Sequence, residues 1–259
     1  MDSLLPFADS HCHLDQLAED AVGEAAAAGV SPIVAVSQDV DSMSAVLALA
    51  GRYPGQVLPG LGIHPCTVTE RGFDRLAPDL ALLSERADDV AVIGETGLDY
   101  KWATSEQQQA EQLRVLELHF ATAARHHKPV NLHSRRCLRQ TLEHAVAFHR
   151  DTGLAVQMHW FTESKKLARI CNDEGIYVSV GPTILANEQA ATVACEVNDD
   201  LLLLESDAPV AVDGIPGHPR RVREVAEKLA GLRGVSLEGL AEQLLANLQR
   251  FLTGASTDA

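Results

Sequence analysis

Residues Leu201–Asp207 read Leu-Leu-Leu-Leu-Glu-Ser-Asp and show the pattern that decides the fold. Four consecutive apolar residues predict a short strand that is buried on both faces, as in a parallel sheet. The run ends in an acidic residue, and Val90–Glu95 repeats this arrangement. Similar runs recur along the whole chain. The predicted strands are Phe7–Asp9, Pro32–Val36, Val57–Gly62, Val90–Glu95, Pro129–His133, Ala155–His159, Ile176–Val180 and Leu201–Ser206.

Amphipathic stretches lie between these strands and predict helices. They are Leu17–Ala28, Ser42–Gly51, Phe73–Ala87, Ser105–His127, Leu138–Asp151, Ser164–Glu174, Glu188–Glu196, Arg220–Leu232 and Leu237–Leu252. Eight strand–helix units without a linker predict one α/β domain over residues 1–253, a (β/α)₈ TIM barrel with parallel strands. An open doubly wound sheet is the alternative, but it would carry a glycine-rich fingerprint where residues 9–13 read Asp-Ser-His-Cys-His. Residues 254–259 are expected to fray.

Composition limits the possible partners. The formal net charge is -15, and such an acidic surface repels nucleic acid at long range. A phosphate-bearing substrate therefore needs a local cationic site, which bound metal ions could supply. The five cysteines form no CxxC pair and favour a reducing compartment. Neither a signal peptide nor a membrane span is indicated, so the chain is expected to be cytoplasmic.

Polar residues of metal-binding type recur where the predicted strands end. In a barrel these positions share the C-terminal face, where active sites lie, so residues distant in sequence would converge on one cavity. The candidates are His11, His13, His64, Glu95, His133, His159 and Asp207. We assign no role to the remaining histidines, which fall mostly in helical segments.

His11 and His13 are two residues apart in an extended segment, so both imidazoles can reach one ion. A lone pair of this kind is a weak signal, and a polar surface turn is the alternative. Asp9 could align with the two histidines as an outer partner. Cys12 should point the opposite way and is not counted as a ligand.

Glu95 directly follows an apolar run, where burial of an unpaired charge would be costly. Two cations would offset that cost, and the two oxygens of a carboxylate can bridge them. An exposed loop glutamate is the alternative, although Gly94 and Gly97 imply close approach of another backbone. His133 and His159 could each be structural. Asp207 could instead be a turn residue before Pro209.

Nitrogen and carboxylate ligands suit Zn²⁺, Mn²⁺, Fe²⁺ or Co²⁺ better than Ca²⁺. Because the two oxygens of the Glu95 carboxylate can bridge a pair of ions, we expect two divalent ions. The choice among zinc, manganese, magnesium and cobalt is left open.

Six motifs in a fixed order resemble the TatD family of metal-dependent hydrolases, which have amidohydrolase-like barrels. The motifs span nearly the whole chain. They are Asp9-Ser10-His11-Cys12-His13-Leu14, Gly62-Ile63-His64-Pro65, Gly94-Glu95-Thr96-Gly97-Leu98-Asp99-Tyr100, His133-Ser134-Arg135, His159-Trp160-Phe161 and Glu205-Ser206-Asp207-Ala208-Pro209.

The resemblance implies one ion on His11, His13, Glu95 and Asp207, and a second on Glu95, His133 and His159. It also implies that His64 faces the substrate and that the activity is hydrolysis of DNA phosphodiesters, commonly from an end. The alternatives are a D-aminoacyl-tRNA deacylase or another ester or amide hydrolase, and a metal-binding subunit of a larger assembly. One departure from the family pattern is Glu163, which replaces a usual glycine and adds negative charge beside the His159 motif.

Roles follow from these expectations. Glu95, His64 and Asp207 are the expected catalytic residues, and Asp207 would orient water and accept its proton. Arg135 could pair with a phosphate, or it could form a surface ion pair. Tyr100 and Trp160 could stack on a terminal base, or they could pack at the rim. The expected partner is nucleic acid, with DNA preferred; nothing in the sequence identifies a protein partner.

Overall fold

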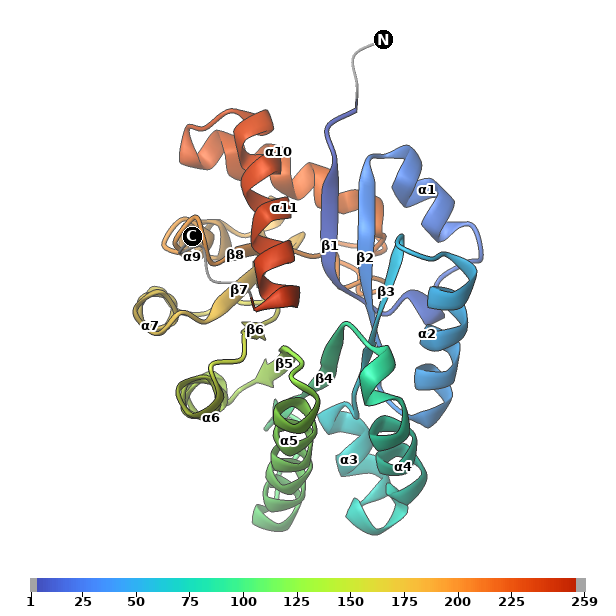
Figure 1. Ribbon diagram of the computed structural model, residues 1–259. Coiled ribbons are helices and arrows are strands. Elements are labelled where there is room, and N and C mark those ends of the chain that lie inside the picture. The colour runs from blue at the N-terminus through green and yellow to red at the C-terminus, as the bar shows by residue number, and fades with distance from the viewer. Residues whose placement is uncertain (1–3, 255–259) are drawn as a thin grey trace.

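The eight predicted strands all form, and they pair in parallel in the order of the chain. The computed structural model describes residues 4–254, and Figure 1 shows the strands following one another around a central axis. Together with the helices between them they form the predicted (β/α)₈ barrel. The strands are β1 (Phe7–Cys12), β2 (Val30–Val36), β3 (Val57–Leu61), β4 (Val92–Asp99), β5 (Val130–Arg135), β6 (Val156–Met158), β7 (Tyr177–Val180) and β8 (Leu202–Leu204).

The barrel is joined between its last and first strands just beyond the end of β8. There the backbone N–H of Asp207 donates to the carbonyl of His11 at 3.0 Å, and His13 N–H donates to Ala208 O at 2.8 Å. These two bonds attach the segment after β8 to the end of β1. They therefore hold Asp207 beside the two histidines of the first motif.

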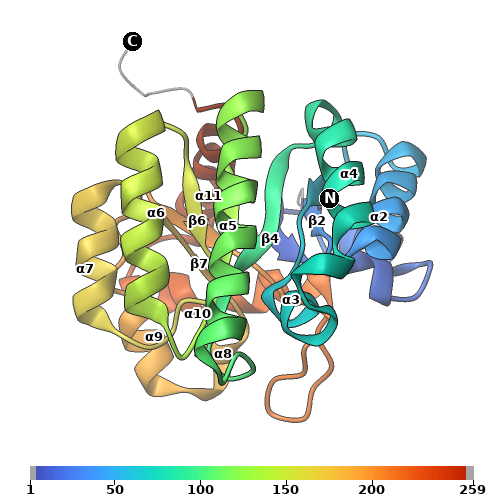
Figure 2. The ribbon, with the colours of Figure 1, turned by 90° about the horizontal axis from the view of Figure 1, so that it is seen from below.

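Helices surround the sheet on its outer side (Figure 2). The α-helices are α1 (Ala21–Ala27), α2 (Val40–Arg52), α3 (Pro65–Arg71), α4 (Ala77–Arg86), α5 (Glu106–His126), α6 (Leu138–Thr152), α7 (Lys165–Glu174), α8 (Thr183–Ala186), α9 (Glu188–Ala194), α10 (Val222–Arg233) and α11 (Leu237–Thr253). Short 3₁₀ helices are η1 (Leu14–Gln16), η2 (Phe73–Arg75), η3 (Ala87–Asp89) and η4 (Pro219–Arg221).

The predicted helices are found, with some changes at their starts. The helix predicted from Phe73 is divided into η2 and α4, because Pro78 fits only in the first turn of a helix. The start of α5 was predicted well: Ser105 and Gln108 form a capping box there. The short helices α3 and α8 were not predicted from the sequence.

Polar side chains fill the centre of the barrel below the site. Gln157 donates to the hydroxyl oxygens of Ser10 at 2.9 Å and Ser179 at 2.8 Å, and all three residues are buried. The hydrogen bonds offset the cost of burying these groups. The network links β1, β6 and β7 beneath the C-terminal face.

The last helix ends at Gly254, which has a left-handed backbone conformation. The rest of the tail that we expected to fray lies outside the described residues. No helix among residues 4–254 is long and apolar enough to cross a membrane.

Candidate metal centre

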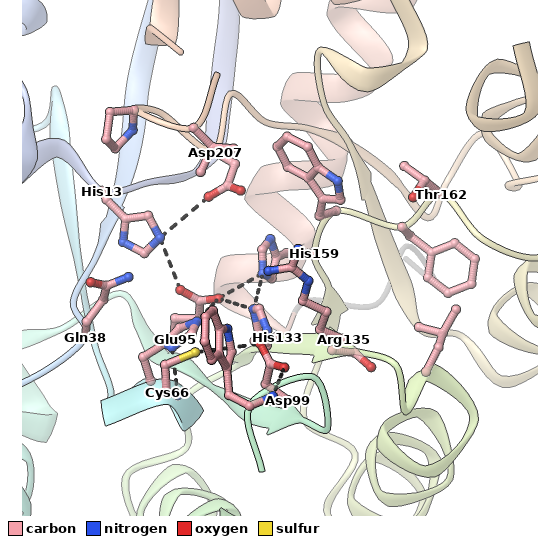
Figure 3. A pocket seen from close by; sticks show the side chains of 18 of the residues that line it. His13, Gln38, Cys66, Glu95, Asp99, His133, Arg135, His159, Thr162 and Asp207 are labelled. Atoms are coloured by element: carbon pink, nitrogen blue, oxygen red, sulfur yellow. Dashed lines mark hydrogen bonds and ion pairs between the residues drawn. The ribbon is translucent and has the colours of Figure 1, made fainter. Parts of the chain in front are cut away.

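The predicted ligands converge at the C-terminal face of the barrel, around a cavity of about 460 Å³. His11 lies beneath the cavity and is fully buried. The other candidates line the cavity wall, and Figure 3 shows several of them directed toward its centre. They are His13, His64, Glu95, His133, His159 and Asp207.

The sequence had led us to expect that Glu95 ends its strand, and this expectation is wrong. Strand β4 continues to Asp99, so Glu95 lies within it and is fully buried. The expected close backbone approach at Gly94 and Gly97 is confirmed. A Cβ at Gly94 would lie 2.6 Å from the carbonyl oxygen of Asn131, and one at Gly97 would overlap the carbonyl of His133. The glycines thus bring β4 against β5 at the level of the site.

The two carboxylate oxygens of Glu95 face two different groups of histidines. Oε2 lies 3.6 Å from Nε2 of His11 and 3.2 Å from Nε2 of His13. Oε1 lies 2.9 Å from both Nδ1 of His133 and Nε2 of His159. One carboxylate is therefore shared between two clusters of nitrogen atoms.

Asp207 completes the first cluster. Its Oδ1 lies 3.4 Å from Nε2 of His11 and 3.5 Å from Nε2 of His13. The backbone of Asp207 has a φ of 45°, which is uncommon for a residue other than glycine. Two hydrogen bonds hold this backbone conformation. The N–H of Asp207 donates to His11 O, and the carbonyl of Asp207 accepts the N–H of Val210 at 2.9 Å. Local strain at this acid is consistent with a functional position.

Outer partners determine which ring nitrogens face the centre. Nδ1 of His11 donates to the side-chain oxygen of Asn131 at 2.9 Å, and Nε2 of His133 donates to Asp99 Oδ2 at 3.1 Å. Nδ1 of His159 faces Glu205 Oε2 at 3.8 Å. A neutral imidazole that donates outward presents a lone pair inward, as a metal ligand requires.

His64 has the opposite arrangement. Its Nδ1 accepts the backbone N–H of Cys66 at 3.0 Å, at the start of helix α3. A neutral His64 must therefore carry its proton on Nε2, which lies 3.4 Å from Glu95 Oε1. Burial lowers the pKa of His64, which favours this neutral form. Although it is near the ligands, His64 presents a donor to the cavity rather than a lone pair.

The residues present fit divalent cations. His11 Nε2 and Glu95 Oε2 are buried without a hydrogen-bond partner among the described residues. Nδ1 of His133 lies 3.2 Å from Nε2 of His159, a distance at which a proton or a cation must lie between the two nitrogen atoms. Burial alone would lower the pKa values of His133 and His159. Their interactions with neighbouring groups, including Glu95, outweigh the effect of burial, so both pKa values are raised. The carboxylates thus favour positive charge at this position, and bound cations would supply it.

Asp9 is not the outer partner of the His11 imidazole, contrary to our expectation. Its carboxylate accepts the backbone N–H of Ser206 at 2.9 Å and the backbone N–H of His11 at 3.2 Å, and Ser206 Oγ also donates to it. Burial raises the pKa of Asp9 to about 8. Asp9 therefore ties β1 to the segment after β8, and Asn131 takes the place beside the ring of His11.

The predicted substrate contacts are only partly brought together. Arg135 and Trp160 line the cavity, as does Glu163. Arg135 is exposed and forms no ion pair within residues 4–254, so the alternative of a surface ion pair is not observed. Tyr100 packs against the core and is not a lining residue, whereas Trp102, two positions later, is. In Figure 3 Arg135 lies across the cavity from His13 and Gln38.

Sequence reasoning missed three buried acceptors, namely Asp99, Asn131 and Glu205. One of them carried a usable signal. Asn131 precedes His133 by two residues within β5, so it lies on the same side of that strand as a candidate ligand. Glu205 lies beyond the end of β8, where the alternation of an extended strand does not apply. Asp99 offered no such spacing, because the continuation of β4 beyond Glu95 was not foreseen.

Known proteins resemble the chain in sequence and in fold. A family model described as TatD related DNase matches residues 8–253. The chain is 32% identical to an uncharacterized metal-dependent hydrolase, YcfH, of Escherichia coli K12, over 94% of each chain. It is 29% identical to human deoxyribonuclease TATDN3, over 90% of each. The crystal structure of YjjV, a TatD homologue from Escherichia coli K12, superposes with a TM-score of 0.84 at 29% identity, covering 98% of this chain and all of the other.

Proposed function

The chain belongs to the TatD-related DNase family of metal-dependent hydrolases, and on that premise we propose that it hydrolyses phosphodiester bonds of DNA with two divalent ions. Single-stranded ends are the preferred substrate in this proposal. Relatives named as deoxyribonucleases support the choice of DNA. The unpaired state of all five cysteines suits a reducing compartment such as the cytoplasm.

The observation that carries the proposal is the division of the Glu95 carboxylate between two clusters. Oε2 faces His11 and His13, and Oε1 faces His133 and His159. A carboxylate with this environment can bridge two cations, which is the arrangement of two-metal hydrolases. In the proposal Asp207 joins the first pair of histidines, and the second pair shares the other oxygen.

The ions, when bound, would supply Lewis acidity, lowering the pKa of water and neutralising phosphate charge. The protein's own groups then have separate tasks. Asp207 faces the cavity and is ionised at neutral pH: burial raises its pKa, but its contacts with His11 and the charges of nearby histidines lower it by more. We assign it the acceptance of the proton from the attacking water.

His64 and Arg135 act on the phosphate in this proposal. The Nε2–H of His64 points into the cavity and can donate to a phosphate oxygen, where it stabilises developing negative charge. Arg135 also lines the cavity and offers a fork of donors. Trp160 lines the same cavity and could contact a base.

The test is a substrate panel with defined metal content. The protein is stripped with a chelator, reconstituted separately with Mn²⁺, Zn²⁺, Mg²⁺ and Co²⁺, and offered single-stranded DNA, RNA, D-aminoacyl-tRNA and a simple carboxylic ester. We expect cleavage of DNA that depends on added metal. The Glu95→Gln variant, purified identically, controls for contaminating nucleases. Hydrolysis of D-aminoacyl-tRNA or the ester without cleavage of DNA would show that the proposed substrate is wrong.

A further inference from the structure

An exposed tryptophan stands at the mouth of the cavity. Trp102 is 52% exposed and lines the same cavity as the candidate ligands. It belongs to the short connection between β4 and α5. A large indole left open to solvent at the edge of a polar site gains little in folding, whereas it offers a flat apolar surface to a ligand.

The connection that carries Trp102 is held by the site itself. Asp99 Oδ1 accepts the backbone N–H of Lys101 at 2.9 Å and of Trp102 at 3.3 Å, and its carbonyl accepts Ala103 N–H at 3.0 Å. The other carboxylate oxygen of Asp99 accepts from His133. One side chain thus fixes both a candidate metal ligand and the backbone of the tryptophan, so the indole is presented from an anchored turn.

One cation lies over this indole, and a second belongs to a residue that lines the same cavity. The Lys101 ammonium lies 5.0 Å from the centroid of the Trp102 ring. Arg135 provides the guanidinium among the residues of the cavity wall. An aromatic face with positive charge beside it suits a ligand that combines a flat ring with an anionic group. A cavity of about 460 Å³ has room for one such unit rather than for a long chain.

We propose that Trp102 is a nucleobase-stacking residue, which binds the base of a nucleotide at the scissile bond while Lys101 and Arg135 contact its phosphates. The inference rests on the proposed function, because it names a subsite of the same nuclease site. Stacking on an aromatic side chain is tolerant of base identity, so Trp102 would strengthen binding without selecting a sequence.

Binding can be tested without catalysis, because the chain contains two tryptophans, Trp102 and Trp160. In the Trp160→Phe variant the fluorescence comes from Trp102 alone. The probes are deoxyadenosine monophosphate and deoxyribose phosphate, which differ only by the base. We expect the nucleotide to quench the emission and the sugar phosphate to leave it unchanged. Equal effects of the two probes, or no effect of either, would overturn the inference.

Titration calorimetry measures how much Trp102 contributes to the affinity for the nucleotide. Trp102→Ala should weaken binding of the nucleotide about 5- to 150-fold, and Trp102→Phe should keep most of the affinity. Leu232→Ala is the matched control, since Leu232 is 43% exposed and does not line this cavity. Its affinity should equal that of the unmodified protein.

Hydrolysis separates the inference from the proposed function. On a dinucleotide, Trp102→Ala should lower kcat/KM by a similar factor, with no change on a dinucleotide whose bases are removed. Equal losses on both substrates would mean that the turn was merely disturbed, and the inference would be wrong. If the unmodified protein cleaves neither dinucleotide, the proposed function fails, and the fluorescence titration still decides whether Trp102 binds a base.

Discussion

His64 and His133 approach the same oxygen of Glu95, yet they present opposite groups to it. His133 donates outward to Asp99, which leaves a lone pair on Nδ1, whereas His64 accepts a backbone N–H and must carry its proton on Nε2. Proximity alone would place both in one set of possible ligands. The hydrogen bonds on the far side of each ring thus distinguish a candidate ligand, His133, from a hydrogen-bond donor, His64.

This difference predicts distinct outcomes for two variants at the residue scale. His64→Gln should retain two metal equivalents per chain and lose about 100- to 1000-fold in kcat, as for a donor to developing negative charge. His133→Gln should lose one equivalent. Metal content after dialysis is measured by atomic absorption, and kcat on a DNA oligomer. Loss of an equivalent from His64→Gln would mean that His64 is a ligand.

Glu95→Gln should remove activity far more than stability. The amide keeps the shape of the side chain but cannot bridge two cations with two anionic oxygens, so we expect a loss of kcat greater than about 100-fold. The barrel core lies beneath this position, so the melting temperature of the metal-free variant should stay close to that of the unmodified protein. Turnover near normal at saturating metal would contradict the bridging assignment.

Helix α3 determines which nitrogen of His64 carries the proton. Its N-terminus contains the N–H that fixes the proton of His64, and the N–H of Ile63 donates to His119 Nε2 at 3.0 Å from α5. The ring of His119 donates from Nδ1 to Val115 O at 2.7 Å, so it bridges its own helix and the segment before His64. Burial lowers the pKa of His119 to about 4.

The buried His119 predicts an acid-sensitive stability. Its folded-state pKa lies below the ordinary value of 6.5, so the unfolded chain takes up a proton first as the pH falls. The contribution is fully present above about pH 6.5 and is lost toward pH 4, at a cost of about 2 to 3 kcal/mol. His119→Gln keeps an acceptor for Ile63 but does not titrate. Chemical denaturation of both metal-free proteins at about pH 7.5 and pH 4.5 measures the difference, and equal losses would refute the assignment.

Asp99, at the end of strand β4, accepts a hydrogen bond from the candidate metal ligand His133, so we expect it to affect metal affinity. Asp99→Asn removes the charge that holds the N–H of His133, and we expect metal binding to weaken about 10- to 100-fold. Asp79→Asn is the control, because Asp79 is also buried but accepts from Val40 N–H and Arg71, away from the cavity. Titration calorimetry with Mn²⁺ compares them. Equal affinities in the two variants would contradict the role of Asp99.

Elements with a strong pattern could be predicted from the sequence, and weakly patterned ones could not. Apolar runs such as Leu201–Leu204 located the strands, because burial on both faces leaves little choice of residue. Helix α3 was missed because Thr67, Val68 and Thr69 are β-branched and disfavour helix. It forms because His64 caps it and Pro65 suits its first turn. The candidate ligands were predicted from their positions at the expected strand ends, whereas Glu205, beyond the end of β8, resembles other buried polar residues of the barrel.

At the scale of the whole molecule, charge and cavity size act together. The net charge of -15 repels an extended polyanion, while Glu163 adds negative charge to the cavity that Arg135 also lines. Contacts with a nucleic acid would therefore be few and local. Figure 2 shows the loop that follows β8 projecting from the barrel, and Pro209 and Val210 of this segment form part of the same wall. A rigid duplex would have to reach the ligands past these walls.

We therefore predict a preference for short or single-stranded ends over long duplex. A blunt duplex must be opened before its terminal phosphodiester reaches the cavity, at a cost of a few kcal/mol for unpairing and unstacking, whereas a single strand avoids that cost. Because Arg135 and Lys101 would neutralise about one or two phosphates, the logarithm of the binding constant should fall with the logarithm of salt concentration with a slope of only about -1. The measurement compares a dinucleotide, a single-stranded oligomer and a blunt duplex at two ionic strengths. Faster cleavage at internal duplex sites, with a steep loss of binding on adding salt, would mean that an extended cationic track exists and that the acidic surface does not limit the substrate.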